Sequence, residues 1–124
     1  MSLRTTPLLP SLLLAAALAW PGNASAAFLS VSDDIPLMTG LIEPADGALV
    51  FDTPAGRIAE VTASGPLSAQ AVRAFYADTL PQLGWRKTGA NAWAREGEGL
   101  RLEFPEQGAV RFVIAPEGAA RPAK

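Results

Sequence analysis

The sequence predicts an α+β domain in which a single helix packs on an antiparallel sheet, with the element order ββαββββ. Three observations lead to this prediction: a hairpin pattern, one amphipathic helical segment after it, and then short apolar runs separated by glycine-containing turns. We divide the chain into a signal peptide (1–26), an extended lead-in (27–47), the α+β domain (48–115) and a flexible tail (116–124).

Residues 1–26 have the three parts of a secretory signal peptide: the basic residue Arg4, the apolar run LLLAAALAW and the small-residue end ASA. The apolar stretch at residues 8–20 is shorter than the roughly 20 apolar residues that a membrane-spanning helix needs. We predict cleavage after Ala26, export, and no stable membrane insertion of the mature chain. The alternative is an uncleaved membrane anchor.

Composition and charge argue against several classes of function. Removal of residues 1–26 from the 124 leaves 98, enough for one small domain. Because Arg4 is lost with the signal peptide, nine of the 10 basic residues remain against 12 acidic ones, a net charge of −3. A mildly acidic chain without a basic stripe is not typical of proteins that bind nucleic acid. The sequence has no cysteine, so a packed core without disulfides must stabilise the domain.

The lead-in (27–47) is rich in turn-forming residues, and its apolar side chains follow neither a helical nor a strand period. A β-hairpin is predicted after it, over LVFDTPAGRIAEV, because two β-rich runs flank the turn sequence TPAG at 53–56. On the second strand Ala59, Val61 and Ala63 share one face. Their small side chains should let a helix sit close to the sheet.

The helix is predicted within PLSAQAVRAFYADTLPQLGW, with Ser68 as the N-cap. An apolar stripe follows at helical spacing: Val72, Phe75, Tyr76, Leu80 and Leu83. Gly84 stands where a left-handed residue is expected after the helix, and Trp85 should pack back on Leu80. Pro81 removes one helical hydrogen bond, so we expect a kink or a tightened last turn. We therefore interpret five residues of this stretch as structural: Phe75, Tyr76, Leu80, Gly84 and Trp85.

Four short antiparallel strands are predicted after the helix, over WRKT, AWARE, LRLEF and AVRFVIA. Leu100 and Leu102 share one face of their strand, whereas Arg101 and Glu103 share the other. The last strand repeats this alternation, with Arg111 on its polar side. The sheet should therefore have one apolar face and one face in water.

Most catalytic chemistries lack their residues in this chain. The absence of histidine excludes Ser-His and Cys-His pairs and the usual zinc sites, and no glycine-rich phosphate-binding motif occurs. We predict no cofactor, no metal and no catalytic residue. Tyr76 is expected at the core boundary, with its hydroxyl in water, rather than as a catalytic phenol. Five carboxylates are expected to act as solubilising groups, with a calcium site as the alternative: Asp33, Asp34, Glu43, Asp46 and Asp52.

Two groups of residues could form a partner or ligand surface. Trp93 shares a strand face with Arg95, so it is either a core residue or an exposed aromatic side chain beside a cation. In the lead-in, Ile35, Leu37 and Met38 have no regular period. They either cover the domain's own edge or offer apolar surface to another chain.

The stretch VRAFYADTLPQLGW, written as V-x-x-F-Y-x-x-x-L-x-x-x-G-W, resembles a signature of an uncharacterised family of small exported proteins of Gram-negative bacteria. DDIPLMTGL and VFDTPAGRIAEV are similar to other parts of that family, and together these segments cover most of residues 33–85. The resemblance implies a one-helix α+β domain in the periplasm and brings no catalytic residues. A looser likeness is to the helix-grip domains of an outer-membrane assembly lipoprotein, but this chain lacks the lipobox cysteine.

These observations favour a non-catalytic protein-interaction or accessory module of the cell envelope, with another envelope protein as its partner. A small-molecule binding module is the first alternative. A carboxylate-dependent enzyme is the second.

Overall fold

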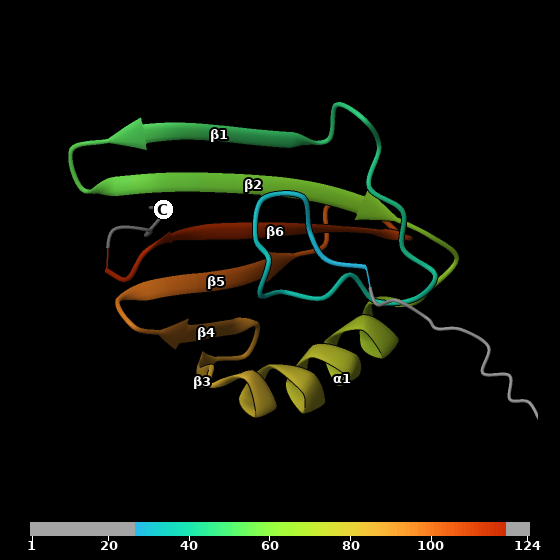
Figure 1. Cartoon of the computed structure of the whole chain (residues 1–124). Coiled ribbons are helices and arrows are strands. Elements are labelled where there is room, and N and C mark those ends of the chain that lie inside the picture. The colour runs from blue at the N-terminus through green and yellow to red at the C-terminus, as the bar shows by residue number, and fades with distance from the viewer. Residues whose placement is uncertain (1–26, 119–124) are drawn as a thin grey trace, which may run out of the picture.

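The computed structural model describes residues 27–118, so the predicted signal peptide (1–26) and the end of the predicted tail (119–124) lie outside the described residues. The described part folds into a six-stranded antiparallel sheet with one α-helix, α1 (Ala69–Thr79), packed on it (Figure 1). The strands are β1 (Ala48–Thr53), β2 (Gly56–Ser64), β3 (Arg86–Gly89), β4 (Ala92–Arg95), β5 (Glu98–Glu103) and β6 (Ala109–Pro116). The predicted α+β class and the order ββαββββ are confirmed.

The strands lie in the spatial order β1-β2-β6-β5-β4-β3. The last strand of the chain, β6, therefore pairs with β2 on one side and with β5 on the other (Figure 1). This arrangement leaves β1 and β3 as the two edges of the sheet. It also brings the hairpin β1-β2 and the three strands after the helix into one sheet, with β6 as the link.

The core lies between one face of the sheet, which we call the inner face, and a layer formed by α1 and the lead-in. The strands contribute alternate residues that are buried in this core: Ala59, Val61, Ala63, Trp93, Leu100, Leu102, Val110, Phe112 and Ile114. The covering layer and the turn after α1 contribute Leu29, Ile35, Leu41, Val72, Tyr76, Leu80 and Trp85. The opposite, outer face carries the polar residues that the alternation predicts, including Arg101 and Glu103.

The lead-in is attached to β2 by backbone hydrogen bonds. Ile42 and Ser64 exchange two of them, at 2.8 and 3.0 Å, and the Thr62 N–H donates to the Gly47 carbonyl at 3.1 Å. Gly65, which follows β2, lies directly against Gly40 of the lead-in. A Cβ atom at Gly65 would lie 1.9 Å from the Gly40 carbonyl oxygen. In Figure 1 the lead-in crosses β2 and β6, whereas α1 lies along β3, β4 and β5. The lead-in, rather than the helix, therefore lies next to β2.

Both ends of the helical segment have the local chemistry that the sequence predicts. The Ser68 hydroxyl accepts a 3.0 Å hydrogen bond from the first turn of α1. At Pro81 the chain tightens into a 3₁₀ turn, η1 (Leu80–Leu83), and Gly84 follows with φ of 93°. The Gly84 N–H then donates to the Pro81 carbonyl and the Trp85 N–H to the Leu80 carbonyl, each at 3.1 Å. This pair of bonds closes the helix end in a Schellman motif.

The last strand ends at Pro116, the first residue of the predicted tail. The next residue, Glu117, donates its N–H to the Gly97 carbonyl at 2.7 Å, and its carboxylate forms a 3.2 Å ion pair with Arg86. The chain is therefore held to the sheet up to Glu117. Neither helical segment within residues 27–118 combines the length and the apolar character that a membrane span requires.

Candidate functional site at the edge strand β1

Tyr76 connects the helix to the lead-in. Its ring is buried and packs edge-on against Phe75 at 4.8 Å and Phe112 at 5.3 Å between ring centroids. Its hydroxyl donates to the Pro36 carbonyl at 2.6 Å and accepts from the Met38 N–H at 3.0 Å. The expectation that this hydroxyl reaches water is therefore wrong. Burial raises the pKa of Tyr76 to about 12, so the phenol stays neutral and serves as a structural bridge.

The other residues that we interpreted as structural lie around the same junction. Leu80 and Trp85 are buried in the core, and Gly84, which lies between them in the chain, takes the left-handed conformation. Phe75 is half-buried and packs against the core from its rim. Leu83, the last residue of the predicted apolar stripe, is exposed instead.

Arg95 contacts two segments that are far apart in the sequence, the lead-in and the end of the helical segment. One Nη atom forms a 2.7 Å ion pair with Asp34 of the lead-in, and the other donates to the Leu83 carbonyl at 2.9 Å. The guanidinium group lies 4.6 Å from the centroid of the Trp85 ring, in cation–π geometry. These contacts occupy Arg95 within the domain and tie the lead-in to the end of the helical segment.

Trp93 is only 1% exposed, which makes it a core residue. It does share the inner face with Arg95, but the cation near its ring is Lys87, whose Nζ lies 4.9 Å from the ring centroid. Arg95 stacks on Trp85 instead. The alternative of an exposed tryptophan beside Arg95 is therefore not the arrangement in this structure.

The predicted lead-in surface is mostly used by the domain itself. Ile35 is 1% exposed and belongs to the core, and Leu37 and Met38 are half-buried against that core. Sequence reasoning left two uses open for these residues. The side chain of Ile35 covers its own domain and does not face solvent, whereas Leu37 and Met38 keep part of their surface in water.

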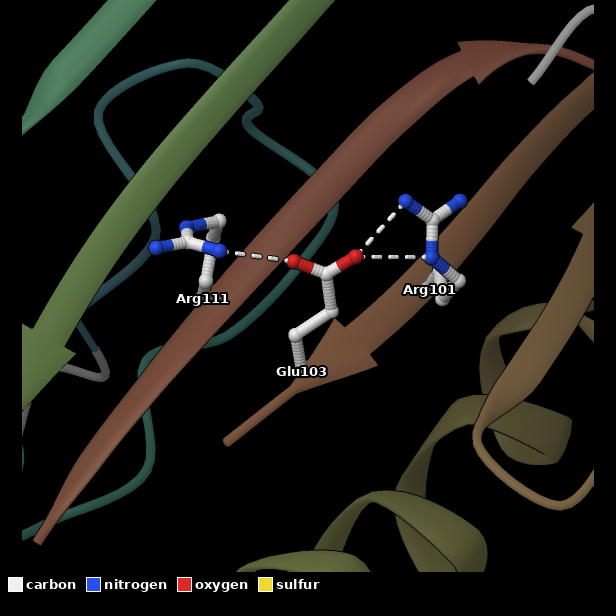
Figure 2. A network of polar contacts seen from close by, with 3 residues as sticks. All are labelled: Arg101, Glu103 and Arg111. Atoms are coloured by element: carbon white, nitrogen blue, oxygen red, sulfur yellow. Dashed lines mark hydrogen bonds and ion pairs between the residues drawn. The ribbon is translucent and has the colours of Figure 1, made fainter. Parts of the chain in front are cut away.

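A network of three charged side chains lies on the outer face (Figure 2). Glu103 receives hydrogen bonds from Arg101 at 2.7 and 3.0 Å and from Arg111 at 2.8 Å. Burial alone would raise the pKa of Glu103, but the hydrogen bonds and charges of the two arginines outweigh it and lower this pKa below its ordinary value. Both carboxylate oxygens are engaged, so Glu103 is poorly placed to act as a general base.

The acidic residues of the lead-in do not converge. Within residues 27–118, no three acidic side chains come together in a way that could hold a metal ion. Asp34 pairs with Arg95, and Glu43 accepts a 3.0 Å hydrogen bond from the Ser30 N–H. These two carboxylates therefore hold the lead-in in place.

Three of the six large apolar residues that are exposed in the described part are consecutive on β1, whereas Phe28, Ile42 and Leu83 lie apart from one another in the chain. Leu49, Val50 and Phe51 are 57%, 44% and 43% exposed, although they are consecutive residues of a strand. Leu49 and Phe51 lie on the outer face, and Val50 lies on the inner face beyond the part that the lead-in and α1 cover. Sequence reasoning did not select these residues. The available signal was an apolar run without alternation, LVF, which conflicts with a strand that has one face in water.

The two edges of the sheet differ in their chemistry. The edge strand β3 is four residues long, contains Arg86 and Lys87, and has a register shift between Lys87 and Gly89. Short length, cations and irregular pairing are the features by which proteins prevent further strand addition. The other edge, β1, pairs regularly with β2 over six residues, and its single charge is that of Asp52. Of the two edges that the described residues form, β1 is therefore the one open to another strand.

Besides a hollow of about 320 Å³ that is lined by Arg57, Arg95 and Glu98, two others lie elsewhere on the described surface. One, of about 400 Å³, is on the outer face over β4 and β5, where small residues form its floor and Thr88, Arg101 and Glu117 supply polar groups. The other, of about 360 Å³, lies where the lead-in, the start of α1 and the connection from β5 to β6 meet.

No family model, curated protein or solved structure matches this chain. Its function is therefore inferred from the geometry of the molecule.

Proposed function

We propose that this protein is a non-catalytic protein-interaction module of the bacterial cell envelope, and that the β1 edge is its binding surface. The signal-peptide pattern of residues 1–26 and the resemblance of the V-x-x-F-Y-x-x-x-L-x-x-x-G-W stretch support a periplasmic location. The observation that carries the proposal is the contrast between the open, apolar β1 edge and the protected β3 edge.

The backbone of β1 supports binding by strand addition. The Thr62 N–H donates to the Gly47 carbonyl, whereas the Gly47 N–H donates to the Pro44 carbonyl, so Gly47 stands at a hydrogen-bonding position of the β1-β2 register with one of its two bonds made. Because such positions alternate along an antiparallel ladder, Ala48, Val50 and Asp52 direct their N–H and C=O groups away from β2. A partner strand would complete these hydrogen bonds and cover the three exposed apolar side chains.

The lead-in offers a smaller binding surface than β1. Leu37 and Met38 are half-buried, so a partner could contact them only through the part of their surface that the core leaves open. We therefore rank β1 above the lead-in as the binding surface. The two surfaces can be separated by substitution, because Leu37 and Met38 do not belong to the sheet.

Affinity capture of the mature chain from periplasmic extract tests the proposal. We expect the double variant Leu49→Asp with Phe51→Asp to lose the captured proteins, because two carboxylates would be buried against the added strand. A double variant of Leu37→Asp with Met38→Asp reports the share of the lead-in. The matched control is Leu83→Asp, which changes an exposed apolar residue of η1 and should capture the same proteins as the parent. Equal capture by the β1 variant and the parent would remove β1 as the binding surface.

The outer-face hollow favours a second candidate function, a small-molecule binding module. Its volume of about 400 Å³ falls in the range of ligand pockets, and Thr88, Arg101 and Glu117 could orient a polar ligand. A Cβ atom at Gly99 would meet its neighbours at 3.7 Å or more, so Gly99→Val should fill the hollow without a backbone clash. A metabolite that raises the melting temperature of the parent but not of Gly99→Val would support this function.

A further inference from the structure

We infer that the β1 edge pairs with the β1 edge of a second copy of this chain, so that one antiparallel sheet continues across both copies. This inference rests on the proposed function, because it names the partner of the same edge.

The backbone restricts the pairing to a few registers. Ala48, Val50 and Asp52 direct their hydrogen-bonding groups outward, whereas the residues between them are bonded to β2. In an antiparallel pair of identical strands, outward-directed residues must face outward-directed residues. The two-fold axis between the strands must therefore lie level with one residue of β1, so that this residue faces its own copy.

The side chains select Val50 as the position of that axis. Val50 then faces Val50 of the second copy on the inner face of the sheet. On the outer face Leu49 of each copy faces Phe51 of the other, so this pair occurs twice. Leu49 and Phe51 occupy non-hydrogen-bonded positions, where opposite Cα atoms lie only about 4.5 Å apart and side chains pack directly. All the large apolar residues exposed on β1 are covered in this register.

The other registers each produce an unfavourable pair of facing side chains. An axis through Phe51 places Asp52 opposite Val50, and an axis through Asp52 places two carboxylates side by side. An axis through Leu49 leaves Phe51 opposite Gly47, without an apolar partner. With the axis at Val50, each Asp52 lies opposite Ala48, and like charges do not face each other.

The β3 edge explains why the pairing closes after two copies. Pairing of β1 with β3 of another copy would repeat without end and produce a filament. That contact would place Arg86 and Lys87 against the apolar side chains of β1, on a strand that is short and irregular. Pairing of β1 with itself uses the open edge of both copies and leaves only the protected edges outside.

Single cysteines test the register, because the chain has none of its own. In the proposed pair the two Val50 Cα atoms are about 5.5 Å apart, within the roughly 4.4–6.8 Å that a disulfide spans. We expect Val50→Cys to form a covalent dimer under mild oxidation. The matched control is Asp52→Cys, whose two copies would lie about 14 Å apart, so it should cross-link at least about tenfold more slowly. Light scattering of the parent should show a concentration-dependent dimer, and the Leu49→Asp and Phe51→Asp double variant should be a monomer.

The outcomes separate this inference from the proposed function. A parent that stays monomeric at all concentrations, with no preference for cross-linking at position 50, overturns the β1 dimer. If that parent still captures envelope proteins through Leu49 and Phe51, the proposed function stands and the partner is a different chain. Faster cross-linking at position 52, or a dimer that survives the double substitution, assigns the contact to another register or surface and also overturns the inference.

Discussion

The Tyr76 hydroxyl donates a 2.6 Å hydrogen bond to the carbonyl of Pro36, 40 residues earlier in the chain. The same oxygen accepts from the Met38 N–H, so one side chain of α1 satisfies two backbone groups of the lead-in. Beside these two groups the lead-in folds on itself, with the Leu37 N–H bonded to the Ala27 carbonyl and the Leu29 N–H bonded to the Ile35 carbonyl. The contact therefore determines how the lead-in lies over the core.

Replacement of Tyr76 by Phe should lower the free energy of unfolding by about 1–3 kcal/mol. The ring keeps its packing against Phe112, but the Pro36 carbonyl and the Met38 N–H lose their partner. Urea denaturation of the parent and the variant measures this difference. Thr88→Val, which removes an exposed hydroxyl, serves as the control and should change stability little. Equal stability of the Tyr76→Phe variant and the parent would contradict the bridging role.

The raised pKa of Tyr76 predicts a loss of stability in alkali. This pKa is about 12 in the folded state, against about 10 for an unfolded chain. Since the folded pKa is the higher one, the stabilisation is complete below pH 10 and is lost as the pH rises through 12. Tyr76 is the one tyrosine of the chain, so tyrosinate absorbance follows this group alone. Tyr76→Phe should lack this loss.

Glu103→Gln should destabilise the sheet at neutral pH by about 0.5–1 kcal/mol, because its partly exposed ion pairs with Arg101 and Arg111 are lost. The pKa of Glu103 is lowered in the folded state, so the stabilisation is present above the ordinary value of about 4.3 and lost as the pH falls through the folded pKa. Thermal melts of parent and variant should therefore converge in acid. The control Glu106→Gln alters an exposed acid outside this network. A stability difference that does not depend on pH would argue against the ion pairs.

Gly65→Ala should destabilise the domain more than Gly97→Ala. A Cβ atom at Gly65 would lie 1.9 Å from the Gly40 carbonyl oxygen, so the lead-in must move away from β2. Gly97 has φ of 84° but nothing within 4 Å, so its substitution incurs only the left-handed backbone strain, about 1–2 kcal/mol. Differential scanning calorimetry of the two variants provides the comparison. Similar melting temperatures would mean that the close approach of Gly40 and Gly65 is not fixed in solution.

The local elements could be predicted because local chemistry determines them. Ser68, Pro81 and Gly84 fix where the helical segment begins, tightens and ends, and they act through bonds to residues at most five positions away. Strand alternation likewise predicts the inner face of β5. These signals are contained within short windows of sequence, and the structure follows them.

The candidate surface could not be predicted, because it depends on which strands are neighbours. Leu49 and Phe51 would be less exposed if β1 had a strand on both sides, and nothing local indicates that β6, rather than β1, lies beside β2 on the inside of the sheet. The partners of the aromatic residues are determined in the same way. Lys87 reaches Trp93 across the β3-β4 pair, and Arg95 reaches Trp85 around the end of η1. The lead-in has no period, so its burial follows only from the space that the other elements leave.

The central place of β6 has a consequence for biosynthesis. Until residues 109–116 leave the ribosome, the β1-β2 hairpin and the β3-β4-β5 meander have no strand that joins them, so neither half can complete the sheet. Pairing over such long separations makes folding slow. A nascent chain of this topology cannot complete its sheet before residues 109–116 are made. For the export that we propose, this delay keeps the chain unfolded enough to pass through a translocation channel. The sheet is then completed after the chain has crossed the membrane.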